Sequence, residues 1–311
     1  METFGFQWHL TDRCNQRCAH CYQERWEPGA ELGLADWRLL ADRIFGTLAD
    51  RPISVNLTGG EPLMLADLPA LVEHLHQKSN LDEVWVITNG SLAPRAMLDR
   101  LAAAERFAGF KVSLESADES VNDTVRGKGN LARVRGKLSD FRATGKQVVL
   151  MTTLGSHNLA AIAATVSWAR QQGVDGVLFE RFVPLGHGQA MASQTLSEPQ
   201  WRQAAVAIAG CAGETLSDAE QTGLKAFWVS FGPGADKLQA ARCNLGPGSM
   251  ALMPNGTVHP CRRLPVPIGD ALQESFENIL ERLAEYRPEP AGGCAALDRA
   301  QEAWNRNRGS A

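Results

Sequence analysis

The sequence lacks several features that mark common classes of protein. No apolar run reaches the ~18 residues that are needed to span a bilayer, and the N-terminal Met-Glu-Thr-Phe-Gly lacks the charged and then apolar segments of a signal peptide. The formal net charge is −4, so the composition offers no basic surface for nucleic acid and no cationic face for a membrane. These absences predict a cytoplasmic protein that binds neither nucleic acid nor membrane.

The remaining composition is ordinary for a globular protein, except for its cysteines. The chain has 311 residues, of which 44% are hydrophobic and 21% are charged. At ~100–200 residues per domain, this length suits one large domain or two. There are seven cysteines, an odd number, in a chain expected in a reducing compartment. Metal ligation is therefore a better interpretation than disulfide bonds.

Three of the cysteines lie close together near the N-terminus. Cys14, Cys18 and Cys21 follow the spacing C-x3-C-x2-C, and the aromatic Tyr22 comes next. Three thiols can bind one metal ion or cluster if the backbone forms a loop, and cysteine thiolates normally ligate iron–sulfur clusters. Three ligands would leave one iron of a [4Fe–4S] cluster with an open coordination position. A zinc site completed by His20, or a group of redox thiols, are alternatives that the cysteines alone leave open.

Strand and helix patterns alternate regularly along the first part of the chain. Strands are predicted at 4–11, 53–57, 84–88, 110–114, 147–153 and 176–183, and helices at 34–49, 67–78, 94–107, 130–143 and 159–171. This alternation predicts an α/β fold with a parallel sheet and helices outside it. The polar and glycine-rich motifs fall at the C-terminal ends of the strands, which form the functional edge of such sheets and barrels.

The cysteine loop and the later segment Thr58-Gly59-Gly60-Glu61-Pro62 together resemble the signature of the radical S-adenosylmethionine (SAM) superfamily. The two glycines allow backbone groups to approach a ligand closely. The resemblance implies a partial (β/α)6 barrel, a [4Fe–4S] cluster on Cys14, Cys18 and Cys21, and SAM bound at the open iron. It implies an enzyme that cleaves SAM reductively to a 5′-deoxyadenosyl radical, which takes hydrogen from a substrate. A low-potential electron donor such as a flavodoxin or ferredoxin is implied as a partner.

The same resemblance implies a set of SAM-binding residues at the strand ends. Ser113 and Glu115 resemble a polar pair that meets the ribose and methionine, although many relatives have Asp-Gly where this chain has Glu115-Ser116. Arg126 matches an arginine placed near the SAM carboxylate, for which a guanidinium is suited because it donates two hydrogen bonds. The full expected set is Tyr22, Gly59, Gly60, Glu61, Pro62, Thr88, Asn89, Ser113, Glu115, Arg126, Arg181 and Val183. A surface arginine and a core aromatic are the plainer interpretations of Arg126 and Tyr22.

A second group of cysteines follows a change in composition near residue 242. Cys243, Gly256 and Cys261 resemble the opening C-x(9–15)-G-x4-C of SPASM and twitch domains, with a hairpin turn at Asn255-Gly256. After this, only Cys294 remains of the cysteines in a full SPASM domain. If Cys294 is aligned with the last cysteine of the C-x2-C-x5-C-x3-C run, the other places fall on Glu281, Ala284 and Pro290.

The resulting hypothesis is a second, auxiliary [4Fe–4S] cluster on Cys243, Cys261 and Cys294. Its fourth iron would be open, or bound by Cys211, a non-cysteine group or a substrate thiolate. A degenerate domain without a cluster is the alternative. The expected domains are a radical SAM core at 1–190, a helical linker at 191–240 and a small twitch/SPASM-like iron–sulfur domain at 241–311.

The resemblance also narrows the function. SPASM and twitch enzymes most often modify ribosomally made peptides, so we expect a peptide maturase that forms a thioether or another crosslink. The chain starts almost at its first strand, and a peptide substrate would then need a separate leader-binding partner. A small-molecule dehydrogenase of a biosynthetic pathway is the second expectation. A non-catalytic iron–sulfur scaffold is a third, which the SAM motifs disfavour. No catalytic acid or base is identified, and His187 and His259 are candidates by position only.

Overall fold

The computed structural model describes residues 2–218, 220–221, 223–246, 248–287 and 294–309. Within these residues the strands form one sheet in the order β11-β10-β9-β1-β2-β3-β4-β5-β6-β7-β8. Its central strands are parallel. They are β1 (Phe4–His9), β2 (Ile53–Thr58), β3 (Leu81–Thr88), β4 (Phe107–Ser113), β5 (Gln147–Leu154) and β6 (Gly176–Arg181). The predicted parallel sheet is confirmed, with small shifts in the strand boundaries.

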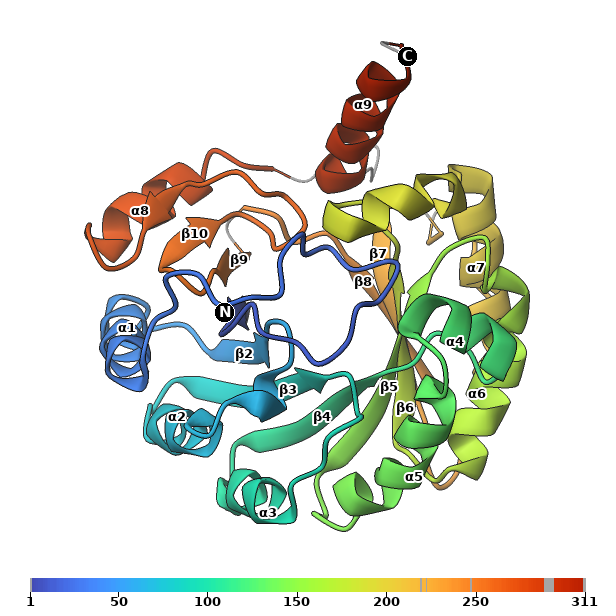
Figure 1. Cartoon of the computed structure of the whole chain (residues 1–311), viewed down its shortest axis with the longest axis horizontal. Helices are drawn as coiled ribbons and strands as arrows, with labels where there is room; N and C mark the ends of the chain where they lie inside the picture. The colour runs from blue at the N-terminus through green and yellow to red at the C-terminus, as the bar shows by residue number, and fades with distance from the viewer. Residues whose placement is uncertain (1, 219, 222, 247, 288–293, 310–311) are drawn as a thin grey trace.

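Helices connect the parallel strands and lie outside the curved sheet (Figure 1). They are α1 (Leu34–Thr47), α2 (Leu68–His76), α3 (Arg95–Ala103), α4 (Glu119–Arg126), α5 (Asn130–Arg142) and α6 (Ile162–Gln171), with the 3-10 turns η1 (Pro62–Met64) and η2 (Leu159–Ala161). In α1 the buried residues Trp37, Leu40 and Ile44 recur at helical spacing, so this helix packs its apolar face on the sheet. The sequence did not predict α4, because its eight residues bury only Asn122 and Val125 and are too few to show apolar periodicity.

The sheet curls until side chains from distant strands meet inside it. The rings of Trp85 on β3 and Trp228 on β7 (Leu224–Ser230) lie edge to face with their centroids 5.6 Å apart. Three strands separate β3 from β7 in the sheet. The Nζ of Lys111 on β4 donates to Asn56 Oδ1 on β2 at 2.6 Å and lies 4.7 Å from the centroid of the Trp85 ring. These contacts across the interior confirm the predicted partial barrel.

The segment 191–240, expected as a helical linker, contributes strands as well as a helix. The 3-10 segment η3 (Gly186–Gln194) leads into α7 (Glu198–Cys211). β7 then pairs antiparallel with β6, and β8 (Lys237–Arg242) pairs antiparallel with β7. Five of the six residues of β8 are exposed, so its sequence shows no alternation of apolar and polar residues. This part of the chain therefore extends the sheet, which the sequence did not predict.

The C-terminal segment adds strands to the opposite edge of the sheet. β9 (Ser249–Leu252) runs parallel to β1, and β10 (Thr257–His259) pairs antiparallel with β9 and with β11 (Gly269–Asp270). Gly256 in the turn between β9 and β10 has a φ of +88°, a conformation that favours glycine. The predicted hairpin at this turn is confirmed.

Two helices complete the C-terminal segment. α8 (Phe276–Leu283) packs on α1, while Figure 1 shows α9 (Ala295–Gly309) projecting away from the barrel. The first turns of α9 are nevertheless anchored. They belong to a small apolar cluster formed by Val183, Leu245, Leu264, Ala296, Leu297 and Ala300. This cluster places the start of α9 beside the loop that follows β6.

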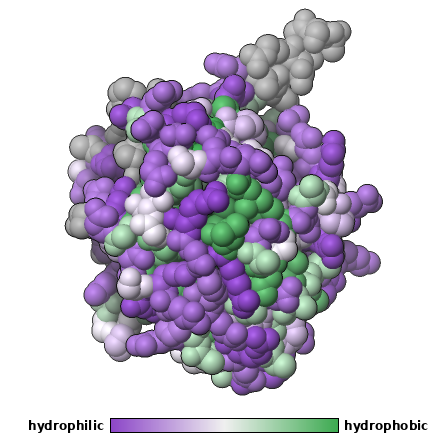
Figure 2. All heavy atoms as spheres, turned by 90° about the vertical axis from the view of Figure 1, so that its left-hand side faces the viewer, coloured by the Kyte–Doolittle hydropathy of each residue, from purple (hydrophilic) through white to green (hydrophobic). Residues whose placement is uncertain are grey.

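The surface of the molecule is mostly polar. Figure 2 shows that the face on the left of Figure 1 is largely hydrophilic, with one hydrophobic area near its centre. The large apolar side chains exposed in the described part of the chain are Leu39, Met64 and Val206. Among the described residues, no helix combines the length and the apolar character that crossing a membrane requires.

Candidate active site

The loop between β1 and α1 carries Cys14, Cys18 and Cys21. Their side chains line one cavity of about 900 Å³, part of which is open to solvent. A loop from the far side of the barrel holds this segment, because Gly188 N donates to Cys21 O at 2.8 Å. The structure thus brings together the three thiols that the C-x3-C-x2-C spacing predicted.

Glycines let the neighbouring loops approach the cysteine loop closely. A Cβ on Gly60 would lie 2.1 Å from Arg13 O, and a Cβ on Gly188 would lie 2.8 Å from His20 O. Gly60 N also donates to Thr11 O at 2.7 Å. A glycine at position 60 is therefore required for docking the cysteine loop, as well as for any approach to a ligand.

The donor set suits an iron–sulfur cluster better than the zinc site that the cysteines alone left open. His20, the candidate fourth zinc ligand, points to Glu115 with its Nε2 3.0 Å from Oε1. Within the residues that the structure describes, no three His, Cys, Asp or Glu side chains are arranged to hold a single metal ion. Burial raises the pKa of the Cys14 thiol to about 11, so cluster binding must displace a proton from it.

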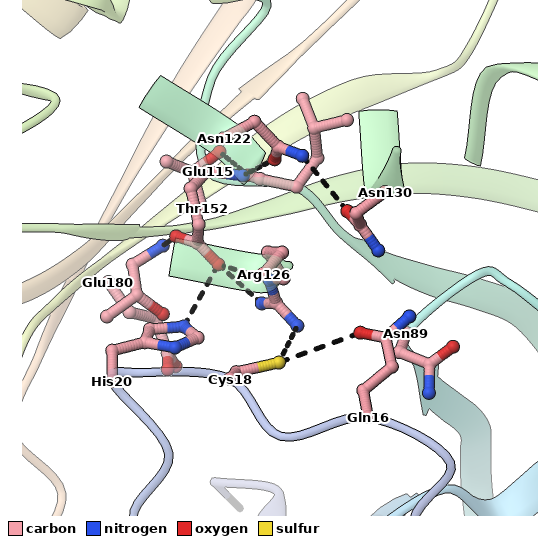
Figure 3. Close-up of polar contacts among 12 residues, drawn as sticks. Gln16, Cys18, His20, Asn89, Glu115, Asn122, Arg126, Asn130, Thr152 and Glu180 are labelled. Carbon is pink, nitrogen blue, oxygen red and sulfur yellow. Dashed lines mark hydrogen bonds and ion pairs between the residues drawn. The ribbon is translucent and has the colours of Figure 1, made fainter. Parts of the chain in front are cut away.

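Glu115 is the centre of a buried ion network beside the cysteines. Figure 3 shows Arg126 and His20 pointing at its carboxylate. Arg126 Nε donates to Glu115 Oε1 at 2.8 Å, and Thr153 N donates to Oε2 at 2.8 Å. Burial opposes ionisation of Glu115, but the charges of Arg126 and His20 outweigh it and lower the pKa to about 2. Glu115 is thus an anion that positions Arg126, whose Nη1 lies 3.9 Å from Cys18 Sγ.

Glu61 ties the ends of two strands together. Its Oε1 accepts from Leu63 N at 3.0 Å and from Thr88 Oγ1 at 2.7 Å, and its Oε2 accepts from Asn89 N at 2.7 Å. The side chain is fully buried, and desolvation raises its pKa to about 7. These bonds hold the ends of β2 and β3 beside the cavity.

Most residues expected to bind SAM line the cavity of the first three cysteines. The lining includes Tyr22, Gly59, Gly60, Thr88, Asn89, Ser113, Arg126, Arg181 and Val183. The expected residues Glu61, Pro62 and Glu115 are not part of this lining. Arg181 also has partners within the protein: its Nη2 donates to Glu198 Oε2 at 2.9 Å, and its guanidinium lies over the Trp201 ring. Contact of SAM with each residue stays a prediction.

Tyr22 and the two candidate histidines have partners within the protein. Tyr22 OH lies 3.0 Å from His9 Nδ1, and desolvation raises the pKa of Tyr22 to about 12. His187 Nδ1 lies 3.1 Å from Cys18 O, so this histidine holds the cysteine loop. His259 lies on β10, and neither histidine is part of the cavity lining. These positions give no support to either histidine as a catalytic acid or base.

The second group of cysteines lines a second cavity. Cys243 follows β8, Cys261 follows β10 and Cys294 precedes α9, and together they line a space of about 1140 Å³ that includes open solvent. Burial raises the pKa of the Cys243 thiol. Cys211 ends α7 and packs against the main hydrophobic core, away from this lining.

The structure describes two of the three positions that would align with further cysteines of a full SPASM domain. Glu281 lies in α8 and Ala284 follows it, while Pro290 lies outside the described residues. Cys243, Cys261 and Cys294 are therefore the thiols of the described C-terminal segment that can share one ligand. All three are free of disulfide bonds.

The two cavities adjoin at a group of charged residues, of which sequence reasoning named only Arg181. Glu180, Arg181, Arg262 and Arg263 line both of them. Two signals were present in the sequence: the arginines directly follow Cys261, and Glu180 is an acidic residue within the buried strand β6. The cavity beside the first cysteines thus adjoins the cavity beside the second at these side chains.

Comparison with protein families agrees with these sites. Residues 8–169 match the Radical SAM superfamily. Residues 243–301 match SPASM, an iron–sulfur cluster-binding domain. The first match contains Cys14, Cys18 and Cys21, and the second contains Cys243, Cys261 and Cys294.

Two curated relatives differ in their activities. Fe-coproporphyrin III synthase from Methanosarcina barkeri is 32% identical over 203 residues, which are 63% of this chain and 48% of the relative. The antilisterial bacteriocin subtilosin biosynthesis protein AlbA from Bacillus subtilis is 25% identical over 277 residues, which are 87% of this chain and 58% of the relative. The chain thus spans about half the length of these relatives.

A solved structure shares the fold over nearly the whole chain. Streptococcus suis SuiB, bound to the precursor peptide SuiA, superposes with a TM-score of 0.71 at 15% identity. The match covers 95% of this chain and 72% of SuiB. The shared fold therefore includes the barrel and the C-terminal segment.

Proposed function

The chain belongs to the radical SAM superfamily and carries a SPASM domain, and from this premise we propose that it modifies a ribosomally made peptide. As a radical SAM enzyme it uses a [4Fe–4S] cluster and SAM, and its SPASM domain implies an auxiliary cluster. The observation that carries the proposal is that the two cavities adjoin at Glu180, Arg262 and Arg263, which line both. A substrate bound at these side chains would lie between the SAM site and the second group of cysteines.

The residues of the first cavity would hold the cluster and SAM. Cys14, Cys18 and Cys21 would ligate three irons, and Arg126 would face the SAM carboxylate. When bound, the reduced cluster and SAM supply a 5′-deoxyadenosyl radical that takes a hydrogen atom from the substrate. The barrel would contribute positioning, and large side chains such as Trp85 and Trp228, which pack against each other in its interior, would help to exclude water.

The residues of the second cavity would hold the auxiliary cluster. Cys243, Cys261 and Cys294 supply three thiolates, so one iron of a [4Fe–4S] cluster would lack a cysteine ligand. A substrate thiolate in the same space could take that position. This arrangement favours a cysteine-containing peptide and a thioether or another crosslink as the product.

Two similarities support a peptide as the substrate. AlbA, a bacteriocin biosynthesis protein, matches 87% of this chain, and SuiB, whose structure was solved with its precursor peptide, shares the fold. The proposal includes a low-potential flavodoxin or ferredoxin as electron donor and a separate protein that binds the leader of the peptide. Both are partners that the chemistry and a leader peptide would require.

A small-molecule substrate is the second candidate. Fe-coproporphyrin III synthase is 32% identical over part of the chain. In this reading the enzyme would oxidise a metabolite and would need no leader-binding partner.

The test is the formation of 5′-deoxyadenosine from SAM by the reduced, reconstituted protein. Wild type is expected to form it, and a Cys14→Ala variant is expected to form none, because the cluster would lose a ligand. Incubation with precursor peptides encoded beside the gene, followed by mass spectrometry, then separates the two candidates. A peptide that loses a hydrogen pair supports the maturase. Unchanged peptides with continued SAM cleavage would favour the small-molecule enzyme, and no cleavage by wild type would contradict both.

A further inference from the structure

One carboxylate lies between two guanidinium groups where the two cavities meet. Glu180 Oε2 is 3.8 Å from Arg262 Nη2 and 4.0 Å from Arg263 Nη1. Both distances exceed the ~2.7–3.2 Å of a good hydrogen bond. The three side chains are largely buried, with exposed fractions of 14%, 11% and 18%. Glu180 therefore makes only long ion pairs with Arg262 and Arg263 and no short hydrogen bond to either.

Two lysines add further positive charge to the same interior. Lys225 lines the second cavity and donates to Asn244 Oδ1, and Lys111 donates to Asn56 Oδ1 in the barrel. The carboxylates that interact with Lys111 are those of Glu83 and Glu180. Besides the Arg181–Glu198 pair, Glu180 and Glu83 thus face the four cations Arg262, Arg263, Lys111 and Lys225. An unbalanced buried charge is unfavourable.

The thiolates of the second group of cysteines would balance part of this excess positive charge. Arg263 interacts with Cys261 and Cys294, and Lys225 interacts with Cys243 and Cys261. Arg263 is also fixed to the barrel, because its Nη1 donates to Arg181 O at 2.8 Å. Arg263 and Lys225 therefore lie near the cysteine thiolates, which would carry negative charge when they bind the cluster.

Arg262 differs from them in its surroundings. The Cζ of its guanidinium lies over the Tyr22 ring, 4.8 Å from the ring centroid, so the cation contacts the aromatic face. Its Nε is buried and has no hydrogen-bond partner among the described residues. It lines both cavities, so a group bound to it would lie between the SAM site and the second cysteines.

We propose that Arg262 receives a carboxylate group of the substrate where the two cavities adjoin. A guanidinium is suited to this role because its fork of N–H donors matches the two oxygens of a carboxylate. The negative charge of the substrate carboxylate would balance the positive charge of Arg262, which lies too far from Glu180 for a good hydrogen bond. The proposal rests on the proposed function and names a feature of its substrate: an acidic side chain of a peptide, or the carboxylate of a small molecule.

The test measures the binding of matched probes to the reconstituted, SAM-loaded enzyme by titration calorimetry. The probes are glutarate, its neutral counterpart glutaramide, and capped Gly-Glu-Gly and Gly-Gln-Gly peptides. In wild type, at least one carboxylate probe is expected to bind about tenfold or more tightly than its amide, because charged hydrogen bonds contribute ~1.5–3 kcal/mol. A preference for glutarate would indicate a small-molecule source, and a preference for the Glu peptide would indicate a peptide source.

Variants of one residue complete the test. Arg262→Gln is expected to abolish the preference for the carboxylate, and Arg262→Lys is expected to keep part of it as a point charge. Arg135→Gln, on the exposed face of α5, is the matched control and should keep the full preference. If Arg262→Gln fails to load its clusters, the comparison of Arg262→Lys with wild type decides.

Two results would overturn the proposal. One is that wild type binds the carboxylate probes no better than the amides, and the other is that Arg262→Gln keeps the wild-type preference. Formation of 5′-deoxyadenosine, measured on the same preparation, separates this failure from that of the proposed function. An enzyme that cleaves SAM but shows no preference contradicts only the carboxylate site, whereas one that cleaves no SAM contradicts the proposed function itself.

Discussion

Arg126 Nη1 lies 3.9 Å from Cys18 Sγ, although 108 residues separate the two in the sequence. The guanidinium is held there by Glu115, to which its Nε donates at 2.8 Å (Figure 3). Arg126 is thus a cation fixed beside a cluster ligand. It would face the thiolate of Cys18 and also the carboxylate of a bound SAM. The first prediction follows from this contact.

Replacing Arg126 with glutamine is expected to weaken SAM binding about tenfold or more, because a hydrogen bond to a charged group contributes ~1.5–3 kcal/mol. The measurement is the dissociation constant of SAM for the reconstituted protein, by equilibrium dialysis. Arg135→Gln, at an exposed position of α5, is the control and should bind SAM like wild type. Unchanged SAM affinity in Arg126→Gln at normal iron content would show that Arg126 does not contact SAM.

Gly60→Ala is expected to destabilise the protein and to lower its cluster content. The new Cβ would lie 2.1 Å from Arg13 O, so the cysteine loop or the end of β2 would have to move, at a cost of ~1–3 kcal/mol or more. The measurements are the free energy of unfolding and the iron content after reconstitution.

A glycine without close neighbours provides the control for this substitution. No atom lies within 4 Å of a Cβ placed on Gly136, which is in the middle of α5. Gly136→Ala should therefore stabilise the protein by ~0.5–1 kcal/mol through helix propensity. Equal effects of the two substitutions would contradict the close docking of the cysteine loop.

The buried Lys111 is expected to make the stability of the folded protein depend on pH. Desolvation lowers the pKa of Lys111 to about 8 in the folded protein, whereas the ordinary pKa of a lysine is 10.5. Between these values the unfolded chain binds more protons, so the contribution of Lys111 to stability rises with pH, by at most ~1.4 kcal/mol per pH unit. Lys111→Met should show a flatter rise than wild type in urea unfolding of the cluster-free protein from pH 8 to 10. Identical slopes would place the pKa of Lys111 near its ordinary value.

Much of the barrel could be predicted from the sequence, because its strands carry buried apolar residues at regular spacing and its helices show apolar stripes. β2 is an example, since Ile53, Val55 and Leu57 alternate with polar residues and the strand ends at Thr58-Gly59-Gly60. β8 could not be predicted because almost all of its side chains are exposed. Its place depends on pairing with β7, which no local pattern reveals.

The candidate site was predictable to a similar extent. Cysteine spacing identified Cys14, Cys18 and Cys21, because these ligands are close in sequence. The contact between Glu180 and Arg262 joins β6 to the loop after β10, so only the curled sheet brings the two residues together. The internal bonds of Glu61 also required the structure, since the motif alone suggested a free acceptor for SAM.

The central claim is that the chain holds two iron–sulfur clusters on separate groups of cysteines. It is tested most directly by the iron and sulfide content of the anaerobically reconstituted protein. Wild type is expected to hold about eight irons, and the Cys14/Cys18/Cys21→Ala and Cys243/Cys261→Ala variants about four each, as two cysteine-ligated [4Fe–4S] clusters predict. About four irons in wild type, unchanged in Cys243/Cys261→Ala and lost in the other variant, would contradict the auxiliary cluster and leave a single SAM-binding cluster.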